Sequence, residues 1–520
     1  MIDSVGPLTL ADLWDQLARD CGDDPFLTFE GQEGVVHRVS YGQFDAETNR
    51  AANMLAAHGV RHGDNVALHL PNGPEFLGAQ FALAKLGAVA VPIAAELQRR
   101  ECEHIVERCQ AQVVVVAAEW AQCYADMPGV RLLVIVGEHA GDPVPGVERI
   151  VSLADRRSHP PVLATSPDVA SDDVAMILFT SGSTAAPKGV MITHANCIYA
   201  GWYGNWQAGM TRQDRMLTPM PMAHSNFQLA ALMPVLTAGC ELVIEARYSA
   251  RRFWGQVRRH RATLVQAVAM MVRTLLLQPP ADDADNVVRH VMYYLPLDAQ
   301  AKDEFEARFG VRLLNSYGST ESICWVVTDF PFGPRRWPSP GRVGLGYQAK
   351  VVDDDGADLP PGATGELLVR GVPGRTLMKG YYRDPEATAR ALDSDGWLHT
   401  GDRCFFDADG YLFFVGRHQD LIKRSGENIS ALEVEAVLLE HPDVAQAAVI
   451  GVPEPIRGEA VRAFLVAHEG HALDVEQVLA FARTRLAQFK VPTDVVLADS
   501  LPQTSTGKTA KHLLDRAPMR

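Results

Sequence analysis

The sequence predicts an α/β fold, in which a large N-terminal domain of α/β subdomains and a small β unit precede a small α+β C-terminal domain. A chain of 520 residues is longer than one hydrophobic core usually organises. Val-rich runs such as 113–116 alternate with segments of helical periodicity, which is typical of buried parallel strands between helices. After residue 420 this alternation starts again, which indicates a second domain.

The first half of the chain supplies the predicted α/β elements in order. Ser40 and Gln43 form a capping-box pattern, and apolar residues recur at helical spacing as far as Leu55. The apolar run NVALHL at 65–70 predicts a strand. The stretch GAQFALAKLGAVAVPI at 78–93 continues the alternation of helix and strand.

In the second half of the chain, the predicted secondary structure changes twice. Residues 330–344 carry four prolines and three glycines, which excludes one continuous helix or a central strand. Asp-Gly and Pro-Gly turns divide residues 349–371 into short strands of a small β unit. In the last part AQAAVIGV at 445–452 predicts a strand, and Asp474 is the predicted N-cap of a helix that runs to Phe489. The apolar face of that helix comprises Val475, Val478, Leu479, Ala482, Leu486 and Phe489.

Charge and cysteine usage limit the class of protein. The net charge of -15 argues against nucleic acid or an anionic membrane as the main partner. The eight cysteines are scattered without the close spacing of a zinc or dithiol motif, which favours a reducing compartment. We find neither a signal-peptide pattern nor an apolar stretch long enough to span a bilayer. We therefore expect a soluble, cytoplasmic protein.

A loop at residues 180–189, TSGSTAAPKG, follows an apolar strand and carries the first chemical signal. Glycine lets backbone NH groups approach an anion, the hydroxyls add donors, and Lys188 adds a positive charge, so the loop suits a polyphosphate. It differs from the Walker pattern, which needs Lys followed directly by Ser or Thr. A bare run of this kind is also compatible with a surface loop.

Two further segments carry polar groups that suit a nucleotide. NSYGSTES offers Tyr317 as a flat stacking surface, Thr320 as a phosphate donor and Glu321 as a hard oxygen ligand for Mg²⁺. WLHTGD ends in Asp402, whose carboxylate can accept two hydrogen bonds from a ribose diol. Each residue alone is also compatible with a structural role.

Two more segments complete the set. GRHQDLIKRSGENIS contains Arg417, a second candidate for the ribose, and LPQTSTGKTAK presents Lys508. Taken together, in this order, the segments resemble the adenylate-forming superfamily: acyl-CoA synthetases, adenylation domains of peptide synthetases, and luciferases. The resemblance spans nearly the whole chain. The stretches YSARRFWGQVRRHRATLVQAVAMMVRTLLLQPP and RRWPSPGRVG are most similar to the crotonobetaine/carnitine-CoA ligase branch.

The resemblance implies an acyl-CoA synthetase that uses ATP, Mg²⁺ and coenzyme A. A carboxylate attacks the α-phosphate of ATP to give acyl-AMP and pyrophosphate, and the CoA thiol then displaces AMP. Three alternatives stay open: a ligase that performs only the thioester step from supplied acyl-AMP, a nucleotide-binding pseudoenzyme, and an enzyme that loads a carrier protein. Which carboxylic acid is activated and the oligomeric state are not indicated.

The resemblance also implies a role for each motif residue. Thr320 meets the α-phosphate, Glu321 holds Mg²⁺, and Lys508 bridges the carboxylate and the phosphate. His224 is the motif histidine beside the acyl cavity. Gly426 faces the incoming pantetheine. The ribose is assigned to Asp402 and Arg417, and the β and γ phosphates to Thr180, Ser181, Gly182, Ser183, Thr184 and Lys188.

The same resemblance divides the chain into an AMP- and acyl-binding domain over 1–416, a hinge over 417–420, and a mobile C-terminal domain over 421–520. Because Lys508 belongs to the small domain, that domain is expected to close for adenylation and to move away for the thiol step.

Several positions depart from the family pattern. Gln419 stands where most relatives carry Asp or Lys as the hinge, and Tyr294–Pro296 replaces the Gly-Ala-Pro stretch that lines adenine. Carnitine-type enzymes carry an acidic residue after the motif histidine, whereas Ser225 and Asn226 stand here, which disfavours a cationic substrate. Four aromatic residues have two interpretations: they form a cage for a cation, or they form the packing face of a helix. They are Tyr199, Trp202, Tyr203 and Trp206.

Overall fold

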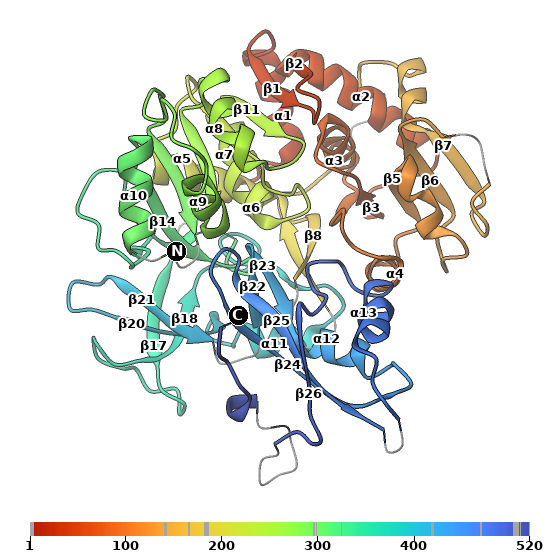
Figure 1. Cartoon of the computed structure of the whole chain (residues 1–520). Coiled ribbons are helices and arrows are strands. Elements are labelled where there is room, and N and C mark those ends of the chain that lie inside the picture. Colours follow the sequence, from red (N-terminus) through yellow and green to blue (C-terminus); the bar gives the residue numbers. More distant parts are fainter. Residues whose placement is uncertain are drawn as a thin grey trace.

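The computed structural model describes residues 5–139, 143–164, 167–180, 187–294, 297, 299–323, 325–417, 421–468, 471–502, 509 and 511–518. Two α/β subdomains and a β unit form a large N-terminal domain, and a smaller domain, blue in Figure 1, packs against it. The predicted fold class is therefore confirmed.

The first subdomain is built on a mixed sheet whose central strands are parallel, as the Val-rich runs predicted. Ser40 caps its first helix, α2 (Tyr41–Ala57), with the predicted capping box. The helices α3 (Pro74–Leu86) and α4 (Arg99–Cys109) connect strands of the same sheet. In order across the sheet the strands are β19 (Gly380–Tyr381), β9 (Lys188–Thr193), β8 (Val174–Thr180), β4 (Val89–Ile93), β3 (Asn65–His69), β5 (Val113–Ala117), β6 (Leu132–Val136) and β7 (Arg149–Ser152).

The second subdomain has a larger sheet, parallel from β14 to β1. Its strands in order are β16 (Arg342–Val343), β15 (Trp325–Thr328), β14 (Leu313–Gly318), β13 (His290–Tyr294), β12 (Leu264–Val268), β10 (Arg215–Thr218), β11 (Glu241–Glu245), β1 (Pro25–Glu30) and β2 (Val36–Ser40). The helices of this half are α1 (Leu10–Asp20), α5 (His194–Ala208), α6 (Ser225–Phe227), α7 (Met233–Ala238), α8 (Ala250–Arg259), α9 (Ala269–Leu276) and α10 (Ala299–Phe309).

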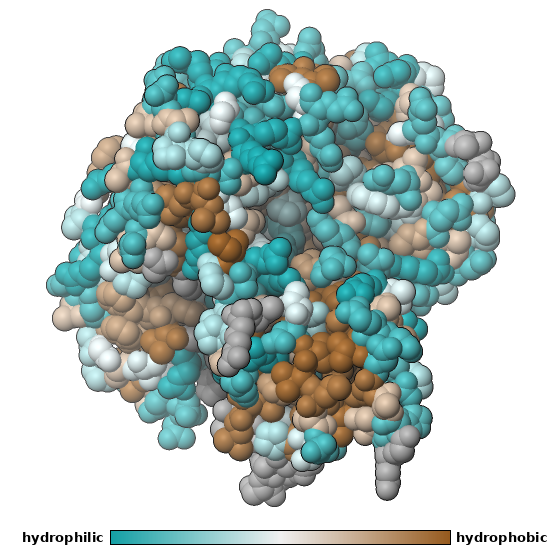
Figure 2. Space-filling view, viewed as in Figure 1, coloured by the Kyte–Doolittle hydropathy of each residue, from teal (hydrophilic) through white to brown (hydrophobic). Residues whose placement is uncertain are grey.

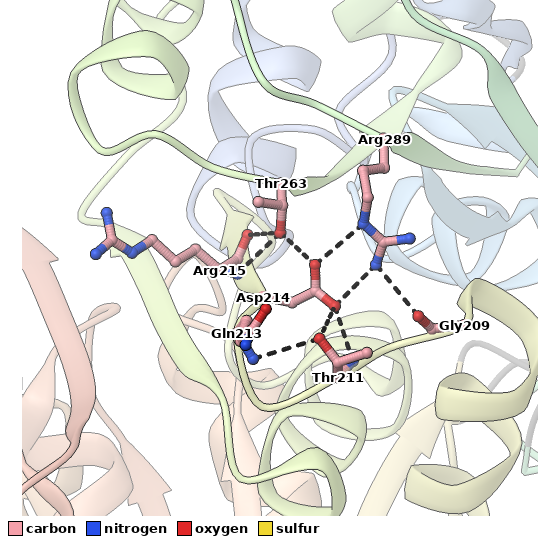
Figure 3. Close-up of polar contacts among 7 residues, drawn as sticks. All are labelled: Gly209, Thr211, Gln213, Asp214, Arg215, Thr263 and Arg289. Carbon is pink, nitrogen blue, oxygen red and sulfur yellow. Dashed lines mark hydrogen bonds and ion pairs between the residues drawn. The ribbon is translucent and has the colours of Figure 1, made fainter.

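A buried carboxylate joins the amino ends of three strands of this sheet (Figure 3). Asp214 precedes β10 and accepts hydrogen bonds from Thr263, before β12, at 2.6 Å and from Arg289, before β13, at 2.8 Å. The backbone NH of Thr211 donates a further bond at 2.8 Å. The opposite, carboxyl ends of these strands remain available for ligands, as is usual in open α/β sheets.

The β unit is an antiparallel sheet of β17 (Gln348–Val352), β18 (Gly365–Arg370), β20 (Trp397–Phe406) and β21 (Leu412–Arg417), flanked by α11 (Pro385–Ala391). This confirms the short strands predicted for residues 349–371. Asp402 on β20 is paired in register with Arg417 on β21, so the two predicted ribose residues lie on neighbouring strands.

The small domain has a sheet with helices α12 (Ala431–Leu438) and α13 (Val475–Arg483). Its strands are β23 (Glu427–Ser430), β22 (Leu421–Arg424), β25 (Gly458–Ala467), β24 (Val444–Glu454) and β26 (Asp494–Leu497). Asp474 caps α13 as predicted. The predicted extent of α13 to Phe489 is wrong, because beyond Arg483 the backbone NH groups of Thr484 and Arg485 bond to the carbonyls three residues back and the α-helical ladder ends.

The surface is mostly hydrophilic on the face shown in Figure 2, with a hydrophobic patch over the small domain. Across the part of the chain that the structure describes, each helix is too short or too polar to cross a membrane.

Candidate functional site

A cavity of about 620 Å³ lies where the two subdomains, the β unit and the small domain meet. The structure brings together there the predicted residues Thr180, Lys188, His224, Tyr317, Thr320, Glu321, Asp402 and Gly426. Outside the described residues lie Ser181, Gly182, Ser183, Thr184, Gln419 and Lys508.

Lys188 and Glu321 meet through a tyrosine that was not predicted from the sequence. The short strand β19 pairs with β9, which places Tyr381 beside the start of β9. The Lys188 ammonium lies 5.1 Å from the centroid of the Tyr381 ring, and the Tyr381 hydroxyl donates to Glu321 at 3.0 Å. This contact holds the carboxylate close to the lysine, although nothing in the local stretch KGYY indicates it.

Tyr317 and Asp402 are in direct contact, although 85 positions separate them in the sequence. The Tyr317 hydroxyl donates to the Asp402 carboxylate at 2.6 Å, and the carboxylate is almost fully buried. Tyr317 stands near the carboxyl end of β14, where an open α/β sheet presents its ligand site. The predicted stacking surface and the predicted ribose acceptor therefore share one wall of the cavity.

His224 faces a carboxylate from the small domain. Its Nε2 lies 3.0 Å from Oε1 of Glu427. Burial opposes charge on both groups, but their mutual attraction outweighs it, so the pKa of His224 is raised and the pKa of Glu427 is lowered. Gly426, which precedes Glu427, has a φ of 97°, a conformation that favours glycine. Gly426 was predicted from the sequence as a site residue, whereas Glu427 was missed.

Aromatic side chains form one part of the cavity wall, and small residues form another. The rings of Tyr294 and Trp325 stack at 4.8 Å with an interplanar angle of 21°. Gly204 of α5 also lines the cavity, and a Cβ atom there would lie 2.4 Å from Pro234 of α7, so glycine allows the two helices to pack closely. A π-helical turn over Gln228–Leu232, a feature frequent at functional sites, continues the wall of the cavity.

The four aromatics of α5 do not form a cage in the described structure. Tyr203 lines the cavity, and Tyr199 is buried beside it. Trp202 and Trp206 are 38% and 37% exposed. The packing interpretation is therefore confirmed for Tyr199, whereas Tyr203 is buried and also lines the cavity.

A second cavity of about 230 Å³ lies between α4 of the large domain and the small domain. It shares with the first cavity the residues Phe179, Ala223, His224, Glu427 and Asn428, so the two meet at the His224–Glu427 pair. Its wall carries Arg100, Glu101, His104, Glu433, Arg485 and Lys490. This cavity was not predicted from the sequence, because its walls come from segments far apart in the chain.

Glu321 is the candidate ligand for a divalent cation. The described residues contain no group of three or more histidine, cysteine or acidic side chains that could hold a metal ion. Magnesium, however, is commonly bound through one or two carboxylates together with substrate phosphates. The single carboxylate of Glu321, in the same cavity as Lys188, fits that kind of site.

Comparisons with known proteins agree with this geometry. The family model described as AMP-binding enzyme matches residues 13–382, and that described as AMP-binding enzyme C-terminal domain matches residues 433–508. Crotonobetaine/carnitine–CoA ligase from Citrobacter koseri is 44% identical over 520 residues, covering 99% of this chain and 100% of the relative.

Two solved structures resemble the whole chain to different degrees. A double mutant of o-succinylbenzoate CoA synthetase from Bacillus subtilis, bound with its product analogue OSB-NCoA, has a TM-score of 0.83 at 27% identity and covers 96% of this chain and 97% of its own. ATP-bound MatB from Rhodopseudomonas palustris has a TM-score of 0.71 at 28% identity, with coverages of 97% and 98%.

Proposed function

The chain belongs to the AMP-binding enzyme family and is an acid–thiol ligase that forms CoA thioesters through an acyl-adenylate, and from this premise we propose which residues carry each step. The observation that carries the proposal is the shared cavity, which brings motif residues from positions 180 to 426 together. The adenylate is assigned to this cavity and the thiol to the second one.

For the adenylation step we assign the phosphates of ATP to the loop that ends at Lys188, and the ribose to Asp402 and Arg417. Joining a carboxylate to a phosphate brings two anions together, and positive charge fixed where negative charge develops usually contributes most to the rate of such a reaction. Lys188 supplies one such charge from the large domain, and Lys508 is proposed to supply the other. Mg²⁺ held by Glu321 would neutralise phosphate charge.

For the thioester step we assign the thiol route to the second cavity, which meets the first at His224 and Glu427. The small domain places Glu427 against His224 where the two cavities meet. This contact supports the proposal that the present arrangement is that of the thioester step. A hinge over 417–420 would release it for adenylation.

Separate assays of the two half-reactions test this assignment. Lys508→Ala is expected to slow acid-dependent exchange of pyrophosphate into ATP by about 10²- to 10³-fold, because it removes a positive charge placed on the developing negative charge. Conversion of synthetic acyl-AMP and CoA to thioester should stay within a few-fold of the wild type. Equal loss in both assays would contradict the assignment.

The same assays separate the alternatives. Wild-type protein that makes thioester from acyl-AMP but shows no exchange with any acid would be a thioester-only ligase. A pseudoenzyme would bind ATP without either reaction, and a carrier-loading enzyme would prefer a carrier protein to CoA.

We propose an electrically neutral acyl group for the substrate. The carboxylates that line the cavity are engaged by protein donors: Glu321 by Tyr381, Glu427 by His224, Asp402 by Tyr317 and Glu366 by the backbone NH of Gly401. Ser225 and Asn226 add neutral groups.

A matched pair of acids tests the proposed charge. Crotonobetaine is compared with its isostere that carries carbon in place of the quaternary nitrogen. A higher kcat/KM for the isostere is expected. Preference for the cation would contradict the proposal and would indicate binding on the aromatic faces of Tyr203, Tyr294 and Trp325.

The cytoplasmic location stays a proposal. It rests on the scattered cysteines, of which Cys21, Cys102, Cys109, Cys123, Cys197 and Cys240 are free thiols in the structure. Cell fractionation tests it.

A further inference from the structure

Lys490 forms a buried ion-pair cluster across the boundary between the two domains. Its Nζ lies 2.6 Å from Oε1 of Glu101 and 2.7 Å from Oε1 of Glu433. Glu433 belongs to α12 of the small domain, like Lys490, whereas Glu101 belongs to α4 of the large domain. The exposed fractions are 5% for Lys490, 9% for Glu101 and 8% for Glu433.

Burial makes this cluster sensitive to the position of the small domain. A charged hydrogen bond removed from water is much stronger than an exposed ion pair, but each of its members is costly to leave alone. The neighbouring pair between Arg100 and Glu440 is half exposed, so it contributes little. If the small domain turned away, Lys490 would keep Glu433 and lose Glu101.

The cluster lies close to the groups that join the two cavities. Glu101, Glu433 and Lys490 line the second cavity together with His224 and Glu427. The contact between Lys490 and Glu101 therefore favours the domain arrangement in which Glu427 faces His224. Among the described residues, neither Glu101 nor Lys490 lines the first cavity, to which the adenylate is assigned.

We propose that Glu101 and Lys490 are positioning residues that form an interdomain latch, which favours the thioester-forming arrangement over the adenylating one. The proposal rests on the two-step function and adds what selects between the steps. A weaker latch lowers the population of the closed arrangement, so the apparent KM for CoA rises in proportion while adenylation is unchanged or faster.

Glu101→Gln tests the latch, since it removes the interdomain charge and leaves the Lys490–Glu433 pair in place. The apparent KM for CoA in the conversion of supplied acyl-AMP is expected to rise roughly 10- to 100-fold, the range for a buried charged hydrogen bond. Acid-dependent pyrophosphate exchange should be equal to or above that of the wild type. Glu101→Asp should recover part of the loss.

A conformational readout separates a latch from a direct contact with CoA. Fluorescent labels are introduced through non-canonical amino acids at Leu277 and Leu497, which are 68% and 52% exposed on the two domains. With an acyl-AMP analogue and without CoA, the efficiency of energy transfer between the two labels should differ between Glu101→Gln and the wild type. If the distribution of label distances is the same in both proteins, the latch is overturned, even if the KM for CoA rises.

The chain offers a matched control inside the large domain. Lys85, 4% exposed, likewise bridges two carboxylates, Asp15 at 2.5 Å and Asp45 at 2.7 Å. Asp45→Asn should lower stability but leave the KM for CoA and the label distance unchanged. Wild-type protein without thioester activity would refute the function itself, whereas active wild type with a normal Glu101→Gln variant would refute only the latch.

Discussion

At the scale of single residues, the His224–Glu427 pair has a predictable dependence on pH. The pKa of His224 is raised by Glu427 despite burial, and the pKa of Glu427 is lowered by His224 despite burial. The stabilisation that protonated His224 gives to the pair is complete below the pKa of the separated histidine, and it is lost as the pH rises through the raised pKa of His224. The stabilisation that ionised Glu427 gives is lost as the pH falls through the lowered pKa of Glu427. The pair is therefore strongest between these two values.

Glu427→Gln should lower the pKa of His224, because burial then acts without the attraction. Titration of the histidine signals by NMR measures this fall in the pKa of His224. An unchanged or raised pKa of His224 would show that the pair is not formed in solution.

Trp325 is the residue expected to limit the size of the acyl group. Its ring stacks on Tyr294 and occupies one wall of the cavity. Trp325→Ala should raise the ratio of kcat/KM for a longer acid to that for a shorter one by about 10-fold or more, since one or two methylenes in an apolar pocket change binding by ~1–3 kcal/mol. Trp202→Ala, at an exposed position of α5, should leave the ratio unchanged. Equal ratios in both variants would exclude Trp325 from the acyl wall.

At the scale of elements, Asp214 anchors the amino ends of β10, β12 and β13. Burial alone would raise its pKa, but hydrogen bonds from Thr263 and Arg289 outweigh burial and lower it. Its contribution to stability is present above the unfolded pKa and is lost as the pH falls through the lowered value. Asp214→Ala is expected to cost about 2–4 kcal/mol at pH 7, and to cost less in acid, in urea unfolding. A cost independent of pH would contradict this account.

Glu245, at the carboxyl end of β11, is expected to behave in the opposite way. Burial, with repulsion from Glu30 on the neighbouring strand, raises the pKa of Glu245 to about 8. Its carboxylate oxygens have no hydrogen-bond partner among the described residues. In the unfolded state Glu245 ionises at the ordinary glutamate pKa, whereas in the folded state it stays neutral up to about pH 8. The free energy of unfolding therefore falls as the pH rises from the ordinary glutamate pKa to about 8.

Glu245→Gln removes that ionisation, so it should stabilise the protein by about 2 kcal/mol at pH 7 and by less at pH 5. Thermal unfolding at both values measures the difference. Destabilisation at pH 7 would mean that the carboxylate has a partner in solution.

Local sequence signals predicted individual elements well where one short segment contains the whole interaction. Ser40 and Gln43 cap α2 reciprocally within four residues, and at the start of α13 the Asp474 side chain accepts bonds from the backbone NH groups of Glu476 and Gln477. The end of α13 was missed because the apolar spacing continues to Phe489, whereas the backbone bonds beyond Arg483 change to partners three residues back, which the spacing does not register. Capping thus fixes where a helix starts more clearly than periodicity fixes where it ends.

At the scale of the whole molecule, the structure brings residues that the family motifs name into one cavity. Tyr317 and Asp402 are in direct contact there, although 85 positions separate them. Tyr381, Glu427 and Lys490 were missed because each acts through a partner on another segment. The bond from Lys490 to Glu101 joins residues 389 positions apart, and no periodicity or motif reports a contact that depends on how two domains meet.

The meeting of the two cavities at His224 and Glu427 has a consequence for inhibitor design. A single compound that joins an acyl-adenylate mimic to a pantetheine arm would occupy both cavities at once. Binding of its first half would hold the second at an effective concentration of ~1 mM for a short flexible linker, so the compound should bind ~10²- to 10⁴-fold more tightly than either half. Such a compound would also trap one domain arrangement, which makes it a selective reagent for crystallising this state.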